Sequence, residues 1–209
     1  MNKEEIRITA FHVWQTGADA LNKLKQTVDM NAFSRAVEII AGCSGRIVTA
    51  GVGTSGAAAK KIAHSLSCVE RPSFFLDPGD AVHGALGSVQ KGDVAILISK
   101  GGGTGEILNI IPALETKKVF IIGVTENPES ILAEHSSLPL IVKVEKEADE
   151  FNMLATTSTM AVTAVFDALC ITLMKYTSYS KEQFAVIHPG GAVGARLTEK
   201  RSQNESRPL

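Results

Sequence analysis

The chain has 209 residues, 44% hydrophobic and 21% charged, as in an ordinary globular protein with one sizeable core. Its formal net charge of −1 provides no broad positive field, so we expect neither nucleic acid nor a membrane surface as a partner. Three distant cysteines favour reduced thiols over a disulfide framework, and the N-terminus lacks a signal-peptide core, so we expect a cytoplasmic protein.

Two helical patterns come first along the chain, at roughly residues 4–26 and 32–43. Apolar runs of strand length then alternate with helical stretches. We expect strands at 46–50, 73–76, 93–99, 119–124 and 138–144, and helices at 54–69, 104–114, 128–134 and 181–186. This alternation predicts an α/β fold of βαβ units, with a parallel sheet covered on both faces. We expect a single domain over residues 1–197 and a mobile tail over 198–209.

One long apolar stretch, residues 153–176, has the length of a membrane span. It carries several threonines and Asp167 in its interior, and a lone buried carboxylate is costly in a bilayer. We therefore expect a helix buried inside the protein and no membrane partner.

Three loops have the composition of an anion site. Residues 51–56 read GVGTSG, residues 99–105 read SKGGGTG, and residues 156–159 read TTST. Glycines let the backbone approach an anion, hydroxyls donate hydrogen bonds, and a following helix offers free N–H groups and its positive end. Each loop alone is a weak signal, because a hydroxyl before a helix is usually a cap. Two such loops after two parallel strands favour a phosphate-binding site at one sheet edge.

The first loop also matches the G-x-G-x-x-G pattern of a dinucleotide-binding turn. Asp77, at the end of the second expected strand, could then hold a ribose hydroxyl. This interpretation leaves the second glycine loop unexplained, so we prefer a smaller phosphate ligand.

Several segments together resemble the sugar isomerase (SIS) domain family, and within it the arabinose 5-phosphate isomerases. They are GVGTSG, PSFFLDPGDAVHGALG (72–87), ILISKGGGTGEI (96–107), IGVTENPES (122–130), VKVEKEAD (142–149), LATTSTMAVTAVFDAL (154–169) and FAVIHPGGAVGARL (184–197). The resemblance implies a three-layer fold with a five-stranded parallel sheet, in a homotetramer with active sites at subunit contacts. It implies interconversion of D-arabinose 5-phosphate and D-ribulose 5-phosphate, a reaction that feeds Kdo synthesis. The chemistry requires neither a cofactor nor a metal.

The resemblance also implies site residues. Those assigned to the substrate phosphate are Thr54, Ser55, Ser99, Lys100, Thr104, Thr156, Thr157 and Ser158. Those assigned to acid–base catalysis are Glu106, Glu147, His83 and His188. Taken singly, each of these four is more typical of a cap, a solvated acidic run or a turn. Either glutamate could be the base, while His188 could open the sugar ring and His83 polarise the carbonyl. The two histidines and two glutamates could also hold a zinc ion, although their wide spacing makes that a weak signal.

Two substitutions depart from the family pattern. Thr54 stands where the arabinose 5-phosphate branch usually has lysine, and this G-T-S spelling resembles the isomerase domain of glucosamine 6-phosphate synthase. Lys100 stands where the second loop usually has asparagine. We hypothesise that the cation has moved from the first loop to the second, where Lys100 serves the anion. Many relatives continue into paired CBS domains, which we do not expect here.

Other interpretations remain open. The altered loops are compatible with a sugar-phosphate sensor that has lost catalysis, or with an isomerase for another sugar phosphate. Against the sensor, all four acid–base positions are present and no helix-turn-helix segment is evident. His12, His64 and His135 fall in helical stretches away from the loops, so we expect surface or packing roles for them.

Overall fold

The sheet of the protein has five parallel strands in the order β2-β1-β3-β4-β5. The computed structural model describes residues 1–190. The strands are β1 (Ile47–Gly51), β2 (Ser73–Phe75), β3 (Val94–Ile98), β4 (Phe120–Thr125) and β5 (Leu138–Ile141). Every residue of β1 and β3 is buried, as expected for central strands covered on both faces. The structure confirms the α/β fold with a five-stranded parallel sheet.

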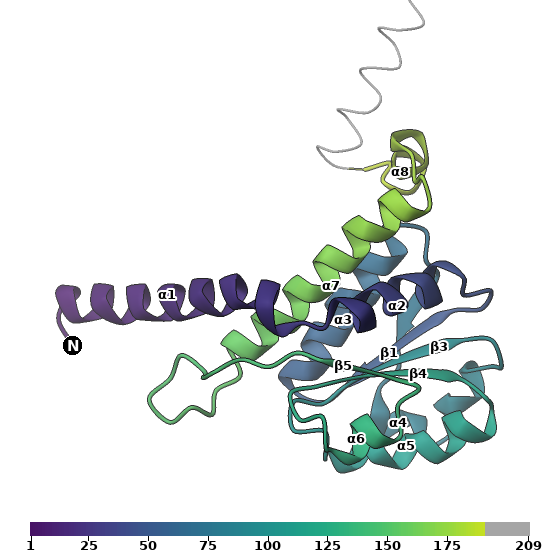
Figure 1. Cartoon of the computed structure of the whole chain (residues 1–209), viewed down its shortest axis with the longest axis horizontal. Helices are drawn as coiled ribbons and strands as arrows, with labels where there is room; N and C mark the ends of the chain where they lie inside the picture. Colours follow the sequence, from purple (N-terminus) through teal and green to yellow (C-terminus); the bar gives the residue numbers. More distant parts are fainter. Residues whose placement is uncertain (191–209) are drawn as a thin grey trace, which may run out of the picture.

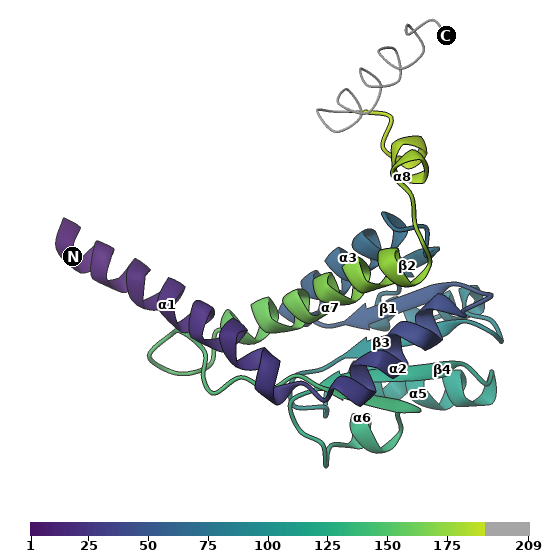
Figure 2. The ribbon, with the colours of Figure 1, turned by 45° about the horizontal axis from the view of Figure 1, so that its top comes forward.

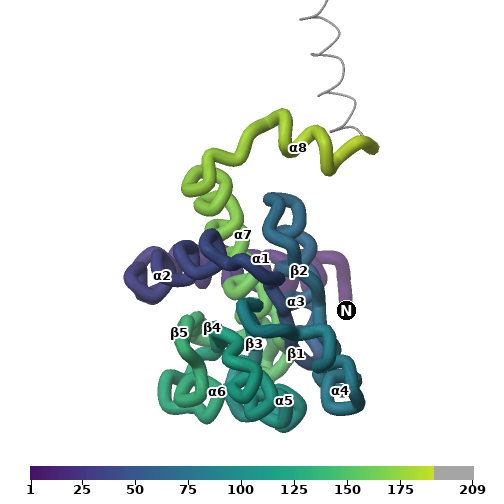
Figure 3. Tube along the Cα trace, turned by 90° about the vertical axis from the view of Figure 1, so that its right-hand side faces the viewer, coloured from purple at the N-terminus to yellow at the C-terminus, as the bar shows by residue number. Residues whose placement is uncertain are grey.

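Helices cover both faces of this sheet in a three-layer arrangement (Figures 1 and 3). One face packs against α2 (Met30–Ala41), α3 (Thr54–Ser67) and α7 (Thr157–Tyr176). The other packs against α5 (Gly105–Thr116) and the short helices α4 (Pro78–Ala81) and α6 (Ile131–Glu134). Successive residues of a strand point to opposite faces of the sheet, so Ile96 packs in the core on the α7 side, while Ala95 and Leu97 pack in the core on the α5 side.

Helix α7 is the long apolar helix expected from the sequence. By length and composition it could cross a membrane, but Phe166, Leu169 and Leu173 are almost fully buried against the sheet and its helices. One side of α7 therefore belongs to the core, whereas Met160, Ile171 and Tyr176 of the same helix are exposed, so the helix is buried on one side only. The helix begins at Thr157, after the first residues of the apolar stretch, because the Asp149 carboxylate accepts backbone N–H groups there and holds them in a loop.

Two helices extend away from the sheet (Figures 1 and 2). The N-terminal half of α1 (Lys3–Thr27) projects beyond the body, and α8 (Lys181–Ile187) lies past the C-terminal end of α7. Both were expected from the sequence. The helix α4 and the 3-10 turn η1 (Ala85–Ser88) were not expected, although Asp77 before Pro78 is a typical helix start. The expected tail 198–209, and residues 191–197 of the expected domain, lie outside the described residues.

Candidate active site

The first glycine loop joins β1 to α3 at the carboxyl end of the sheet. Gly53 has φ of 59°, a conformation that favours glycine, and places Thr54 and Ser55 in the first turn of α3. Gly51 and Gly56 bring strand and helix into close contact, since a β-carbon on Gly56 would lie 2.7 Å from the Gly51 carbonyl oxygen. No side chain of the described residues caps α3, and the Gly56 N–H donates to the Val52 carbonyl, so the N–H groups of Thr54 and Ser55 are the ones that remain available to a ligand.

The second glycine loop follows β3 and is held by hydrogen bonds from residues at the end of β4. The Lys100 carbonyl accepts the Thr125 hydroxyl at 2.8 Å and the Glu126 N–H at 2.9 Å. Gly102, with φ of 70°, packs on Ser130, and its carbonyl accepts the N–H of Leu132. The backbone of Lys100 is therefore held firmly, while its side chain remains 37% exposed. At the two ends of the loop, the hydroxyls of Ser99 and Thr104 lie 2.8 Å apart in a hydrogen bond.

The carboxylate of Glu147 lies at the N-terminus of α7 and has no exposed surface. Lys100 Nζ lies 2.8 Å from Oε1, which also accepts the hydroxyl of Ser158. Oε2 accepts the backbone N–H groups of Thr156 at 2.9 Å and of Ser158 at 3.2 Å. The Asn152 side chain accepts the Glu147 N–H at 2.6 Å and fixes the backbone. This carboxylate thus neutralises the positive end of α7 and the ammonium of Lys100.

Two opposing effects set the pKa of Glu147. Burial alone raises it, because a charged carboxylate loses its hydration. The hydrogen bonds from Lys100, Ser158 and the backbone of Thr156 and Ser158 outweigh burial and lower the pKa to about 2. Lys100 makes the largest of these favourable contributions. Glu147 is therefore ionised at neutral pH.

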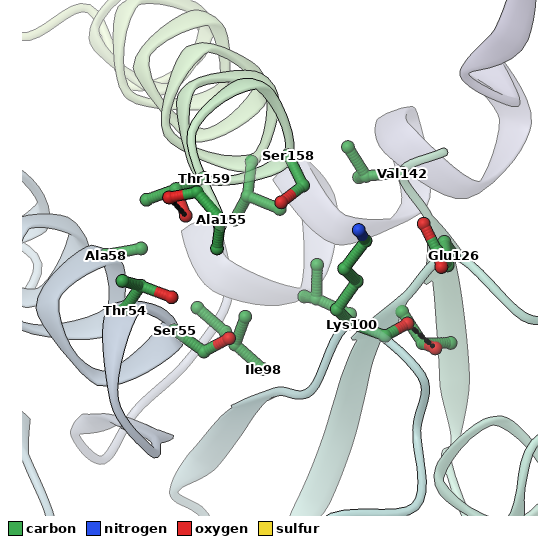
Figure 4. A pocket seen from close by; sticks show the side chains of 13 residues that line it. Thr54, Ser55, Ala58, Ile98, Lys100, Glu126, Val142, Ala155, Ser158 and Thr159 are labelled. Carbon is green, nitrogen blue, oxygen red and sulfur yellow. Dashed lines mark hydrogen bonds between the residues drawn. The ribbon is translucent and has the colours of Figure 1, made fainter. Parts of the chain in front are cut away.

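A cavity of about 80 Å³ opens between α3, α7 and the ends of β3 and β4 (Figure 4). Its volume holds several water molecules. Thr54 and Ser55 of α3 face Ser158 and Thr159 of α7 across it, and Lys100 lies beside it. Apolar side chains supply the remaining walls, from Ala58, Ile98, Val124, Val142, Ala155 and Val162. Donors, one cation and apolar walls together can hold the phosphate end of a small organic molecule.

The structure gathers part of the residue set expected from the sequence. Thr54, Ser55, Lys100 and Ser158 line the cavity, and Glu147 contacts two of them. Ser99 and Thr104 lie at the end of β3, paired with each other. Thr156 and Ser158 already donate to Glu147, whereas Thr157 is buried outside the lining. The assignments to phosphate stay predictions.

None of the four expected acid–base residues lines the cavity itself, and of the four only Glu147 contacts residues of the lining, Lys100 and Ser158. Glu106 is exposed in the first turn of α5, and His83 is exposed after α4. His188 ends α8, where its ring stacks on Phe184 at 3.9 Å and its Nδ1 lies 3.0 Å from the Phe184 carbonyl oxygen. Since α7 spans roughly 30 Å and separates α8 from Glu147, one chain does not bring His188 to Glu147 in this conformation.

Thr125, Glu126 and Thr159 also line the cavity; Thr159 belongs to the TTST loop noted in the sequence, whereas Thr125 and Glu126 were not singled out there. Glu126 follows β4 at the carboxyl edge, and its carboxylate has no partner among residues 1–190. The rule that ligands bind beyond the carboxyl ends of parallel strands could have found it.

Within residues 1–190, no three His, Cys, Asp or Glu side chains lie close enough to share a metal ion.

Comparison with known proteins identifies relatives of the chain. A model described as the SIS domain matches residues 40–172. A Listeria monocytogenes structure, described as a candidate sugar-phosphate isomerase, is 55% identical with a TM-score of 0.90. The match covers 91% of this chain and all of that one. A structure from Escherichia coli CFT073 in complex with arabinose 5-phosphate is 32% identical with a TM-score of 0.87, covering 90% of this chain and all of that one.

A curated relative is longer than this chain. The arabinose 5-phosphate isomerase KdsD of Francisella tularensis is 39% identical over 194 residues, which are 91% of this chain. The chain spans 59% of that relative's length.

Proposed function

The chain belongs to the SIS domain family, and on this premise we propose that it is an aldose–ketose isomerase that converts D-arabinose 5-phosphate to D-ribulose 5-phosphate. One observation carries the proposal: a buried, ionised carboxylate, Glu147, lies next to a cavity that combines hydroxyls, a helix N-terminus and a lysine. The curated relative named for this activity and the neighbour that holds arabinose 5-phosphate support the choice of sugar. The reaction calls for no nicotinamide or metal, and the free thiols fit a cytoplasmic setting.

The phosphate of the substrate binds at the α3 side of the cavity in this proposal. The uncapped N–H groups of α3 and the hydroxyls of Thr54 and Ser55 donate to it, and Lys100 supplies the positive charge. The hydroxyls of Ser99 and Thr104, and those of Thr156, Thr157 and Ser158, complete the proposed set. Because the phosphate does not react, its binding energy orients the carbons that do.

Proton transfer between C1 and C2 follows at the other end of the substrate. After ring opening, a glutamate removes the proton from C2 and the carbonyl oxygen gains negative charge, giving an enediolate. The proton then returns to C1, while the proton of the C2 hydroxyl passes to the oxygen on C1, so that C2 becomes the ketone and C1 carries a hydroxyl. Glu147 is the base best supported by burial and by its place beside the cavity, with Glu106 as the alternative. His188, which a second subunit contributes in this proposal, opens the ring, and His83 assists the carbonyl.

An isomerase assay tests this function. Purified protein is incubated with D-arabinose 5-phosphate, and ribulose 5-phosphate is measured alongside a panel of four- to six-carbon aldose phosphates. We expect turnover of arabinose 5-phosphate that falls by at least about 100-fold in Glu147→Gln, as is typical for loss of a general base. Turnover of another sugar alone would correct the substrate and keep the reaction class.

A second candidate is a sugar-phosphate-binding regulator without catalysis. The strong acidity of Glu147 favours it, because a general base works best with a pKa near the operating pH. Binding without turnover would support this alternative: sugar phosphates would raise the melting temperature, since they bind only the folded state, while no aldose phosphate would be converted.

A further inference from the structure

The low pKa of Glu147 conflicts with its proposed role as a general base. Lys100 contributes to that low pKa and also lies at the proposed phosphate site. The ammonium of Lys100 lies 2.8 Å from the Glu147 carboxylate, and Lys100 also lines the cavity. The Lys100 ammonium thus borders both the Glu147 carboxylate and the space that we assign to the substrate phosphate. Figure 4 shows Lys100 in the wall of that space.

The backbone of Lys100 is held in place, whereas its side chain can change conformation. Hydrogen bonds from Thr125 and Glu126 hold its carbonyl, whereas its side chain is partly exposed on a flexible four-carbon stem. The ammonium can therefore turn toward the cavity without any movement of the loop. Glu126, also beside the cavity and without a partner for its carboxylate in the described part of the chain, adds negative charge on that side.

A phosphate in the cavity would compete with Glu147 for this ammonium. A phosphate near neutral pH carries more negative charge than a carboxylate and forms strong charge-assisted hydrogen bonds. Once Lys100 turns to it, Glu147 keeps the neutral donors of Thr156 and Ser158 and loses the one cationic partner that it has among the described residues. The burial of Glu147 then has a larger influence on its pKa and favours uptake of a proton by the carboxylate.

We propose that Lys100 is a positioning residue that couples phosphate binding to the basicity of Glu147. In the empty site, Lys100 holds Glu147 as a weak base; a bound phosphate draws the ammonium away and makes the carboxylate ready to accept a proton. This coupling rests on the proposed function for its purpose, but it is a property of the site that can be measured without turnover.

The first test uses inorganic phosphate as the probe and carbon-13 NMR of glutamate carboxyls as the readout. Glu147→Gln identifies the Glu147 signal by its absence. Without phosphate, we expect Glu147 to remain ionised down to the lowest pH at which the protein stays folded. With phosphate at saturation, judged from the melting temperature, we expect a titration midpoint that lies at least about one pH unit above that lowest pH, a tenfold or greater change in proton affinity.

Variants at Lys100 separate coupling from a general effect of phosphate. In Lys100→Met the midpoint should already be raised and phosphate should no longer move it, whereas Lys100→Arg should retain the response. Lys91→Met, a change at an exposed lysine outside the cavity, should behave as the wild type. Should Lys100→Met fail to fold, the wild-type titration and Lys100→Arg still decide the matter.

Two results would overturn the coupling: a wild-type midpoint that phosphate does not move, or a melting temperature that phosphate does not raise. Turnover of aldose phosphates adds an independent readout. In an active enzyme, the acidic limb of kcat should lie at higher pH than that of kcat/KM, because kcat reports the substrate complex and kcat/KM the free enzyme. Absence of turnover with a phosphate-dependent midpoint would remove the isomerase function and leave the coupling intact.

Discussion

At the scale of single residues, Gly102 fixes the loop that carries Lys100. Its φ of 70° disfavours any residue with a β-carbon, and that carbon would overlap the side chain of Ser130 and approach Thr125 Oγ1 at 3.0 Å. We expect Gly102→Ala to lower the free energy of unfolding by at least about 2 kcal/mol, measured by urea denaturation. Gly103→Ala is the matched control: its β-carbon would meet nothing within 4 Å, so a change below about 0.5 kcal/mol is expected.

Glu147 also makes a contribution to stability that depends on pH. Its pKa is about 2 in the folded protein against 4.5 ordinarily, so ionisation favours the folded state by about 3 kcal/mol at neutral pH. A lowered pKa gives stability that is complete above about pH 5 and disappears as the pH falls from 4.5 toward 2. We expect Glu147→Gln to destabilise the protein by about 2–4 kcal/mol at pH 7, with a difference that shrinks in acid.

Urea denaturation between pH 3 and 8 measures this difference, with Glu145→Gln as the control from the same segment. Glu145 pairs with Lys23 at the surface, where ion pairs contribute little. Equal losses for the two variants at pH 7, or a pH-independent loss for Glu147→Gln, would show that the network around Glu147 is not what stabilises the segment.

At the scale of elements, the close contact of β1 and α3 sets the position of the expected phosphate donors. Gly56→Ala would place its new β-carbon against the backbone of β1 and push the first turn of α3 away from the cavity. We expect inorganic phosphate to bind at least about tenfold more weakly to this variant, measured from the dependence of the melting temperature on phosphate. Gly105→Ala, at the start of α5, has open space around its β-carbon, and its folding stability should remain near the wild type. Unchanged phosphate binding in Gly56→Ala would place the anion elsewhere.

The elements themselves could largely be predicted from the sequence. Buried strands such as β3 read as unbroken apolar runs, and the residues of α2, α3 and α5 repeat with helical spacing. The 3-10 turn η1 was missed because four residues are too few to show a helical repeat of apolar positions. The start of α7 was placed too early because the loop before it is also apolar. That start depends on hydrogen bonds to Asp149, which the apolar pattern does not encode.

The site could be predicted only in part. The two glycine loops were found because they follow strands whose carboxyl ends meet at one edge. The pairing of Lys100 with Glu147, 47 residues apart, depends on how the segment after β5 folds back onto α7, and no local pattern encodes this. For the same reason the hydroxyl cluster at Thr156 gave no sign that it already holds a carboxylate.

At the scale of the whole molecule, the projecting part of α1 exposes a set of large apolar residues, each more than half exposed: Ile6, Ile8, Phe11 and Trp14. Apolar surface of this kind marks contacts between proteins, so the expected homotetramer remains our prediction. We expect light scattering to give the mass of four chains for the wild type, and Trp14→Glu to yield smaller species at the same concentration. A wild type that runs as a monomer would contradict this prediction.

Assembly of subunits affects catalysis directly, because Glu147 lies at the N-terminus of α7 whereas His188 lies beyond its C-terminus, at the end of α8. If both serve one reaction, a second subunit has to bring His188 to the cavity. We expect Glu147→Gln and His188→Ala to be inactive alone and to regain activity when co-expressed with separable tags and purified as mixed oligomers. Random mixing gives roughly a quarter of the sites an intact glutamate and an intact histidine from different chains. Activity near that fraction of the wild type would support a shared site, whereas mixed oligomers that stay inactive would mean that each chain supplies both residues, or that His188 has no part in the reaction.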